Sequence, residues 1–304
     1  MRVLLAGATG TFGGPLVREL VGAGHEVVGI GRSEGGGERL RRLGATPLLV
    51  DVMDRRALLD SVGGESFDAV IHELTALKKP PTSHGDMRAT NALRIDGTAH
   101  LLDAARATGA TRFVTQSIVF GYGYRDHGKR LLTEDDPFGV PYGNAFDEHL
   151  AAMLSTEKQV TTAQGIHGVA LRYGLFYGAD IDQMARMLRR RMLPVVRDGG
   201  EIPFVHHADA ATATLAALER GDPGSVYNIV DDTPATFRDL IEQVAAAKDT
   251  PAPLNVPRWL LGTAAPYGAS LFGGISMRVS NERAATRLGW RPRYPSVREG
   301  VDAS

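Results

Sequence analysis

The sequence contains no cysteine, and this absence excludes disulfide bonds, thiolate zinc sites and a cysteine nucleophile. The chain also lacks an excess of charge of one sign, because its net charge is −1. This near balance argues against nucleic acid as the main partner. No apolar run approaches the ~20 residues that a membrane-spanning helix needs. No cluster of His, Asp and Glu has metal-ligand spacing, so we expect no metal. A small molecule remains as the expected partner.

A signal peptide is not expected either, because residues 1–6 already form the pattern of a strand. We therefore expect a cytoplasmic protein, as a monomer or a homodimer, with neither nucleic acid nor a membrane as partner. The 304 residues, 43% of them apolar, suffice for a nucleotide-binding domain with a smaller partner domain.

The first motif of the chain is a set of three glycines near the N-terminus. An apolar run from Val3 to Ala6 is followed by Gly7, Gly10 and Gly13 as G-x-x-G-x-x-G, and apolar residues then recur at helical spacing over 16–21. A strand, a glycine turn and a helix in this order present free backbone N–H groups to a pyrophosphate. The motif predicts dinucleotide binding; a tight turn without a ligand is the alternative.

The end of the second predicted strand, His25 to Ile30, bears on the choice of cofactor. An acidic residue at this place would hold the ribose 2′-hydroxyl of NAD, but the chain has Gly31, Arg32 and Ser33 there. An arginine pairs with a 2′-phosphate that a carboxylate would repel. We expect NADP(H) to be preferred, with NAD(H) possible; the alternative is that Arg32 lies solvated on the rim of a loop.

Strand and helix patterns alternate along the first part of the chain. This order predicts an α/β fold, a doubly wound parallel Rossmann sheet with helices on both faces. We expect a dinucleotide-binding domain over residues 1–171 and a mainly substrate-binding domain over 172–304, with segments that return to the sheet. Predicted strands include 48–50, 67–71, 112–115 and 167–171; predicted helices include 39–43, 87–108, 147–164, 184–193 and 259–271; predicted loops include 121–145 and 172–178.

These residues resemble the extended short-chain dehydrogenase/reductase family, also called the NAD-dependent epimerase/dehydratase family. The glycine turn fits its cofactor loop, and Ile95-Asp96-Gly97-Thr98 fits its central helix, although Arg94 replaces the usual Asn. Further matching stretches are Asp51-Val52, His72 to Ala76, Arg172 to Gly178, Phe204 to Asp209 and Leu288 to Pro292. Asp51 fits the adenine contact of the family, although a second helix cap is an alternative for it.

The resemblance implies a nicotinamide cofactor, a small C-terminal substrate domain and often a dimer. The cofactor-binding residues that it implies are Gly7, Thr9, Gly10, Thr11, Phe12, Gly13, Arg32, Ser33, Asp51, Val52, Leu74, Thr75, Ala76, Gln116, Ser117, Tyr173, Gly174 and Leu175.

The catalytic residues of that family are missing. Its chemistry uses a Tyr-x-x-x-Lys pair and a Ser or Thr, and no tyrosine of this chain is followed by lysine four positions later. When Glu157 is aligned with the helix glutamate of the family, His149 and Met153 occupy the Tyr and Lys places, and Ile118 occupies the Ser/Thr place. A second register offers Tyr142 and Phe146 for the pair.

Three residues remain as catalytic candidates, each with a structural alternative. Ser117 at the end of the fifth strand offers a hydrogen bond to a carbonyl, or it only satisfies the strand end. His149 offers a proton at near-neutral pH, or it is a histidine at the edge of the core. Tyr142 lies in a predicted loop and has the same two interpretations.

Two functions fit these observations, and a third fits less well. The first is a ketoreductase acting on an aromatic polyketide ketone, in which a hydroxyl of the substrate replaces the missing acid; the chain resembles angucyclinone ketoreductases, atypical family members without the Ser-Tyr-Lys set. The second is a non-catalytic NADP(H)-binding or redox-sensing protein. The third, a nucleotide-sugar epimerase or dehydratase, needs an acid/base group that the chain lacks.

Overall fold

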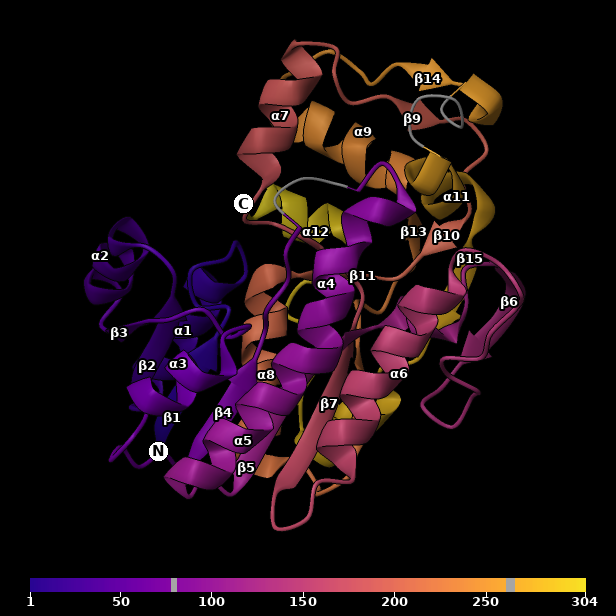
Figure 1. Cartoon of the computed structure of the whole chain (residues 1–304). Helices are drawn as coiled ribbons and strands as arrows, with labels where there is room; N and C mark the ends of the chain where they lie inside the picture. The colour runs from indigo at the N-terminus through magenta and orange to yellow at the C-terminus, as the bar shows by residue number, and fades with distance from the viewer. Residues whose placement is uncertain (78–80, 261–265) are drawn as a thin grey trace.

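A parallel sheet forms the centre of the computed structural model, which describes residues 1–77, 81–260 and 266–304 (Figure 1). Within these residues the main sheet has seven strands in the order β12-β7-β5-β4-β1-β2-β3, and each pair in it is parallel. Its strands are β1 (Arg2–Ala6), β2 (Glu26–Gly31), β3 (Thr46–Leu49), β4 (Ala69–His72), β5 (Arg112–Ile118), β7 (His167–Tyr173) and β12 (Val226–Ile229). The order reverses between β1 and β4, which is where such sheets bind ligands.

Helices cover both faces of this sheet, because its strands are apolar on both sides. One apolar layer contains buried residues of α1 (Gly13–Gly22), α2 (Glu34–Arg42) and α8 (His207–Arg220). The other contains buried residues of α3 (Arg55–Ser61), α5 (Thr98–Thr108) and α6 (Asp147–Thr161). The predicted doubly wound Rossmann fold is therefore confirmed.

A third apolar cluster lies among the elements of the C-terminal half. Figure 1 shows α7, α9 and α11 at the end of the molecule opposite the N-terminus. The helices are α7 (Ile181–Arg189), α9 (Phe237–Ala247), α11 (Pro266–Gly274) and α12 (Val297–Asp302). Short strands pair as β8 (Leu175–Tyr177) with β11 (Phe204–His206), β9 (Val195–Val196) with β14 (Asn255–Val256), β10 (Glu201–Ile202) with β13 (Ala235–Thr236), and β6 (Asp126–Leu132) with β15 (Ser276–Val279).

Several predicted boundaries are wrong, and for two of the predicted loops the reason is contact between distant segments. The predicted loops 121–145 and 172–178 contain β6 and β8, whose partners β15 and β11 come much later in the chain. The predicted helix 39–43 begins at Glu34, since Ser33 caps it by accepting from the Gly36 N–H. The predicted helix 184–193 begins at Ile181 and ends at Arg189. Of the predicted helix 259–271, residues 261–265 lie outside the described residues.

Candidate active site

The glycine turn packs too tightly for any other residue type at two of its positions. Gly7 has φ +96°, and a Cβ there would lie 2.4 Å from the Glu73 carbonyl oxygen. A Cβ on Gly13 would lie 2.3 Å from the Ala8 carbonyl oxygen. The Gly10 N–H donates to the Gly7 carbonyl over 3.0 Å and closes the turn. The turn therefore holds the N-terminus of α1 against the end of β4, in the arrangement that accepts a pyrophosphate.

A cleft of about 520 Å³ opens above this turn. Its lining includes many of the predicted cofactor residues: Gly7, Thr9, Gly10, Thr11, Phe12, Gly13, Arg32, Asp51, Val52, Leu74, Thr75, Ala76 and Gln116. It also includes residues that the sequence analysis missed, among them Arg39, Glu73, Leu93, Phe176 and His207. Its glycines leave the backbone of the turn open to a bound dinucleotide, as a pyrophosphate site requires.

Two arginines lie at the edge of this cleft. Arg32 is 67% exposed, and its Nη1 lies 3.8 Å from Asp51 Oδ2. Asp51 also accepts from the Met53 N–H through Oδ1, while Asp54 caps α3. Arg39 extends from α2, and its Nη1 lies 3.5 Å from the Thr9 carbonyl oxygen. Sequence reasoning missed Arg39 as a cleft residue, because the three consecutive glycines at the start of α2 have low helix propensity and do not indicate a helix.

The remaining predicted cofactor residues do not line the cleft. Ser33 caps α2. Tyr173 is fully buried, with its hydroxyl oxygen 3.1 Å from Glu73 Oε1 and 2.7 Å from Thr214 Oγ1. Gly174 and Leu175 lead from β7 into β8. Ser117 is buried at the end of β5, and its Oγ has no partner among the described residues.

Glu73 lies directly beneath the glycine turn. Burial raises the pKa of Glu73 well above its usual range, against the opposing effect of the Tyr173 hydroxyl. This shift favours the neutral form of the carboxyl group. A neutral carboxyl group at this place does not repel a pyrophosphate.

The predicted helix over 87–108 is interrupted where it passes the cleft. It comprises η1 (His84–Met87), α4 (Arg88–Ala92), a π-helical turn (Leu93–Gly97) and α5. Side chains bind the carbonyl groups of this π-turn: His72 donates to Leu93 over 3.2 Å, Thr98 to Arg94 over 2.6 Å and Gln159 to Ile95 over 3.0 Å. The sequence predicts an uninterrupted helix here. It does not reveal the π-turn, because the side chains that stabilise the turn include residues of β4 and α6, which are distant in the chain.

In the alignment through Glu157, the Tyr and Lys places of the family fall on His149 and Met153 of α6. Met153 is buried in the core. His149 is fully buried, with Nδ1 2.9 Å from Asn91 Nδ2 and Nε2 2.9 Å from His84 Nδ1. An amide nitrogen only donates, so Nδ1 accepts and the His149 proton is on Nε2. Burial, together with His84 and Arg94, lowers the pKa of His149 to about 4, and the ring is neutral near neutral pH.

The three catalytic candidates are not brought together. Tyr142 is 40% exposed and lines a separate hollow of about 250 Å³ with Tyr122, Arg125 and neighbouring residues. The Arg125 guanidinium lies over the Tyr142 ring, with its Cζ 4.9 Å from the ring centroid. No hydrogen bond of the described residues joins the side chains of Ser117, His149 and Tyr142. Their catalytic roles stay predictions.

Four aromatic rings surround His149 instead: His84, Tyr124, Phe146 and Tyr267, here called the aromatic cluster. Tyr124 and Phe146 stack with centroids 4.1 Å apart, and His84 stacks on His149 at 5.2 Å. The hydroxyl oxygens of Tyr124 and Tyr267 lie 3.2 Å apart. Sequence reasoning missed Tyr124 and Tyr267, because no local pattern connects residues 143 positions apart.

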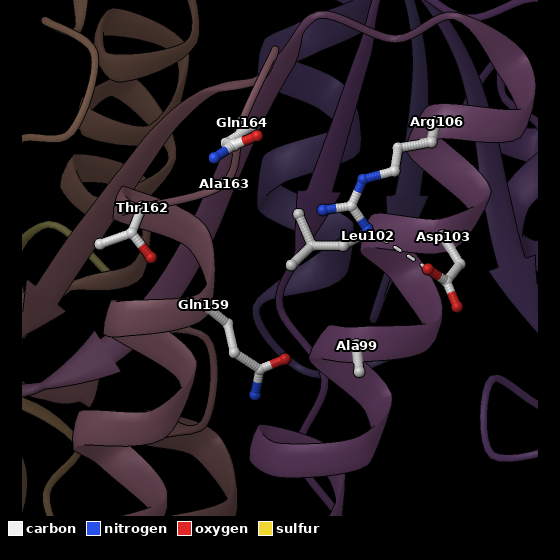
Figure 2. Close-up of a pocket in the computed structure, with 8 residues that line it drawn as sticks. All are labelled: Ala99, Leu102, Asp103, Arg106, Gln159, Thr162, Ala163 and Gln164. Carbon is white, nitrogen blue, oxygen red and sulfur yellow. Dashed lines mark hydrogen bonds and ion pairs between the residues drawn. The ribbon is translucent and has the colours of Figure 1, made fainter.

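A second hollow lies between α5 and α6 (Figure 2). Its volume is about 610 Å³, and it is lined by Ala99, Leu102, Asp103, Arg106, Gln159, Thr162, Ala163 and Gln164. Arg106 points to Asp103 and pairs with it over 3.3 Å. None of the predicted site residues is among these eight, and the hollow shares no lining residue with the cofactor cleft.

The fold, the glycine turn and the cleft agree with a family match over residues 3–230, to the NAD dependent epimerase/dehydratase family. The chain belongs to this family. It is an NAD(P)-dependent oxidoreductase, since relatives in the family are named reductases and ketoreductases.

Two curated relatives match along nearly the whole chain. The 3-diazoavenalumate denitrifying reductase of Streptomyces sp is 34% identical, over 99% of this chain and 99% of its own length. The 4-hydroxy-2-methyl-3-oxo-4-farnesyl-3,4-dihydroquinoline-1-oxide ketoreductase of Stigmatella aurantiaca is 28% identical, over 100% of this chain and 95% of its own length.

A solved structure shows the same fold. The UDP-glucose-4-epimerase of Stenotrophomonas maltophila, with bound NAD and formylated UDP-arabinopyranose, has a TM-score of 0.77 and 23% identity. The match covers 99% of this chain and 96% of that chain.

No described helix combines the length and the apolar character needed to cross a membrane. Among residues 1–77, 81–260 and 266–304, no group of three or more His, Cys, Asp and Glu side chains is placed to hold a metal ion.

Proposed function

We propose that this family member is a ketoreductase that prefers NADP(H) and reduces a ketone of an aromatic polyketide, similar to the angucyclinone ketoreductase of simocyclinone biosynthesis. One observation carries the proposal. The chain has a cleft suited to a dinucleotide, and when Glu157 is aligned with the helix glutamate of the family, Ile118, His149 and Met153 take the places of its proton-handling residues. Such a site can hold the cofactor for hydride transfer but supplies no acid or base of the usual kind.

The proton then has to come from elsewhere. When bound, the nicotinamide supplies the hydride. The neutral His149 has no imidazolium proton to give, and Met153 cannot hold a ribose or lower a phenol pKa. A hydroxyl on the substrate, next to the ketone, supplies the hydrogen bond that stabilises the developing alkoxide.

The preference for NADP(H) is supported by the two arginines at the cleft edge. Arg32, which follows β2, and Arg39 of α2 both line the cleft, and a guanidinium pairs well with a phosphate. Asp51 also lines the cleft, and its Oδ2 lies 3.8 Å from Arg32 Nη1.

The test follows NADPH absorbance with pairs of aromatic ketones that differ only in a hydroxyl next to the carbonyl. The hydroxylated member of each pair is expected to react, and the member without it to react at least ~100-fold more slowly, the size of a typical acid/base contribution. Equal rates for both members would contradict protonation by the substrate.

A second reaction is favoured by one of the relatives. The 3-diazoavenalumate denitrifying reductase is named for the loss of nitrogen from a diazo compound. We propose the reduction of an aryl diazonium group as the second candidate: hydride adds at carbon, the C–N bond breaks, and dinitrogen leaves with the bonding electrons. This step forms no alkoxide, so it needs no proton donor at the places of Ile118, His149 and Met153.

The two reactions are separated by their products. Incubation with NADPH and an aryl diazonium salt is expected to release dinitrogen and the unsubstituted arene if the second candidate holds, measured by mass spectrometry against an enzyme-free control. A panel in which neither ketones nor diazonium salts consume NADPH, despite tight cofactor binding, would favour the redox-sensing alternative.

A further inference from the structure

Arg94 is a buried cation without a counter-ion in the described structure. Its residue is only 9% exposed, and its buried Nη1 has no hydrogen-bond partner among the described residues. No ion pair of the described residues includes it, and no residue outside the description is Asp or Glu. A buried charge is strongly unfavourable unless it is paired. The charge of Arg94 therefore lacks a partner among the described residues, and a bound anion would supply one.

The groups around Arg94 are donors and flat rings. The charge of Arg94 acts on Tyr124, Tyr267 and His149, opposing the rise in the pKa of both phenols that burial causes. The two phenol oxygens lie 3.2 Å apart, and the Phe146 ring lies 4.1 Å from Tyr124 and 5.7 Å from Tyr267 between centroids. A guanidinium with phenol hydroxyls and aromatic walls suits a planar aromatic anion.

This place borders the cofactor cleft. Leu93, which precedes Arg94 in the π-turn, lines the cleft. On the preceding helix, Thr90 Oγ1 accepts from the N–H of Ala76 over 3.2 Å, and Ala76 also lines the cleft. The π-turn itself is held by side chains of β4, α5 and α6. The backbone of Arg94 is thus held next to the cofactor cleft.

We propose that Arg94 binds a carboxylate or phenolate of the substrate, so that the enzyme acts on acidic aromatic compounds. This inference rests on the proposed reduction of an aromatic substrate and narrows its chemical class. Tyr124 and Tyr267 act as further donors to the same anion. Arg94 takes no part in the chemical step: it positions the ring so that the acceptor carbon faces the cofactor.

The test measures binding of 3-acetylbenzoate and of its methyl ester to the enzyme saturated with NADP⁺, by calorimetry. The wild type is expected to bind the benzoate at least ~10-fold more tightly than the ester, because hydrogen bonds to charged groups contribute this much or more. Arg94→Gln is expected to lose ~10- to 100-fold of the benzoate affinity and to leave the ester unchanged. Arg94→Lys should retain part of the preference.

Arg88→Gln is the matched control, since Arg88 is an exposed arginine at the start of α4. It is expected to behave like the wild type. A benzoate preference that persists in Arg94→Gln would overturn the proposal.

A second measurement separates anion binding from a structural role. Arg94→Met removes an unpaired buried charge and is expected to raise the melting temperature of the ligand-free enzyme, whereas Arg88→Met should leave it unchanged. A lower melting temperature together with an unchanged benzoate preference would identify Arg94 as structural. Binding of 3-acetylbenzoate through Arg94 tests this inference alone, because this ketone lacks a neighbouring hydroxyl; the proposed reduction is tested separately by the paired ketones, and its failure there would leave the anion site standing.

Discussion

At the scale of single residues, burial decides how the titratable groups of this protein behave. Glu73 and Asp231 are carboxyl groups whose pKa burial raises, and His149 is a ring whose pKa burial lowers. Arg32 and Asp51 are exposed at the cleft edge, with Nη1 of Arg32 3.8 Å from Oδ2 of Asp51. The buried groups therefore govern stability and positioning, whereas the exposed ones govern which cofactor is attracted.

Arg32 is the residue on which the cofactor preference depends. Arg32→Asp is expected to weaken NADPH binding by ~10- to 100-fold, because it replaces a charge-assisted contact by repulsion, and to change NADH binding little. Dissociation constants from fluorescence titration check this, with Arg41→Asp on the following helix α2 as the control. An equal loss for both cofactors would remove Arg32 from the 2′-phosphate site.

Ser117, His149 and Tyr142 are the predicted catalytic candidates, and the structure does not join them. If the substrate provides the proton, Ser117→Ala, His149→Gln and Tyr142→Phe should each keep kcat within ~10-fold of the wild type. Steady-state rates with one hydroxylated ketone check this. A loss of ~10⁴-fold in one variant would instead identify that residue as the general acid.

Asp231 makes stability depend on pH. Burial raises its pKa to about 8, Tyr177 opposes this effect, and Asp209 adds to it. Between pH 4 and 8 the folded state then binds a proton that the unfolded state has lost, so stability falls as pH rises through this range. Asp231→Asn is expected to flatten this part of the curve and to raise the melting temperature at pH 8. Melting temperatures of both proteins from pH 5 to 8.5 provide the measurement; parallel curves would contradict the expectation.

At the scale of elements, the glycine turn and α2 use glycine for different reasons. Gly7 has a positive φ and no room for a Cβ, whereas Gly35 of α2 has no heavy atom within 4 Å of a Cβ position. The first glycine is required by geometry, and the second only adds conformational freedom to the unfolded chain.

A matched pair of substitutions follows from this difference. Gly35→Ala is expected to stabilise the protein by about 0.5–1 kcal/mol, and Gly7→Ala to destabilise it by more than that and to abolish cofactor binding. Urea unfolding and NADPH titration check both variants. A Gly7→Ala protein that binds NADPH normally would contradict the assignment of the pyrophosphate to this turn.

At the scale of the whole molecule, the two halves of the chain share structure. β12 from the second half pairs with β7 in the main sheet, and α8 contributes to the same apolar layer as α1. We propose that residues 172–304 mainly form the substrate-binding part while their returning segments tie it to the dinucleotide-binding part.

This sharing predicts one cooperative unfolding transition. Differential scanning calorimetry is expected to give equal calorimetric and van't Hoff enthalpies, because neither part can unfold without breaking the main sheet. NADP⁺ at ~100 times its dissociation constant should raise the whole transition, by about 2.7 kcal/mol in unfolding free energy. Two resolved transitions, of which only one responds to NADP⁺, would contradict the shared sheet.

The sequence by itself determined the features that rest on local patterns. The glycine turn, the alternation of strands and helices, and the lack of a Tyr-x-x-x-Lys pair are all visible within a few dozen residues, because backbone geometry and burial impose them locally. The pairing of β6 with β15, the π-turn that fixes Arg94, and the meeting of Tyr124 with Tyr267 were decided only by tertiary structure. These depend on contacts between segments far apart in the chain, for which no local spacing carries a signal.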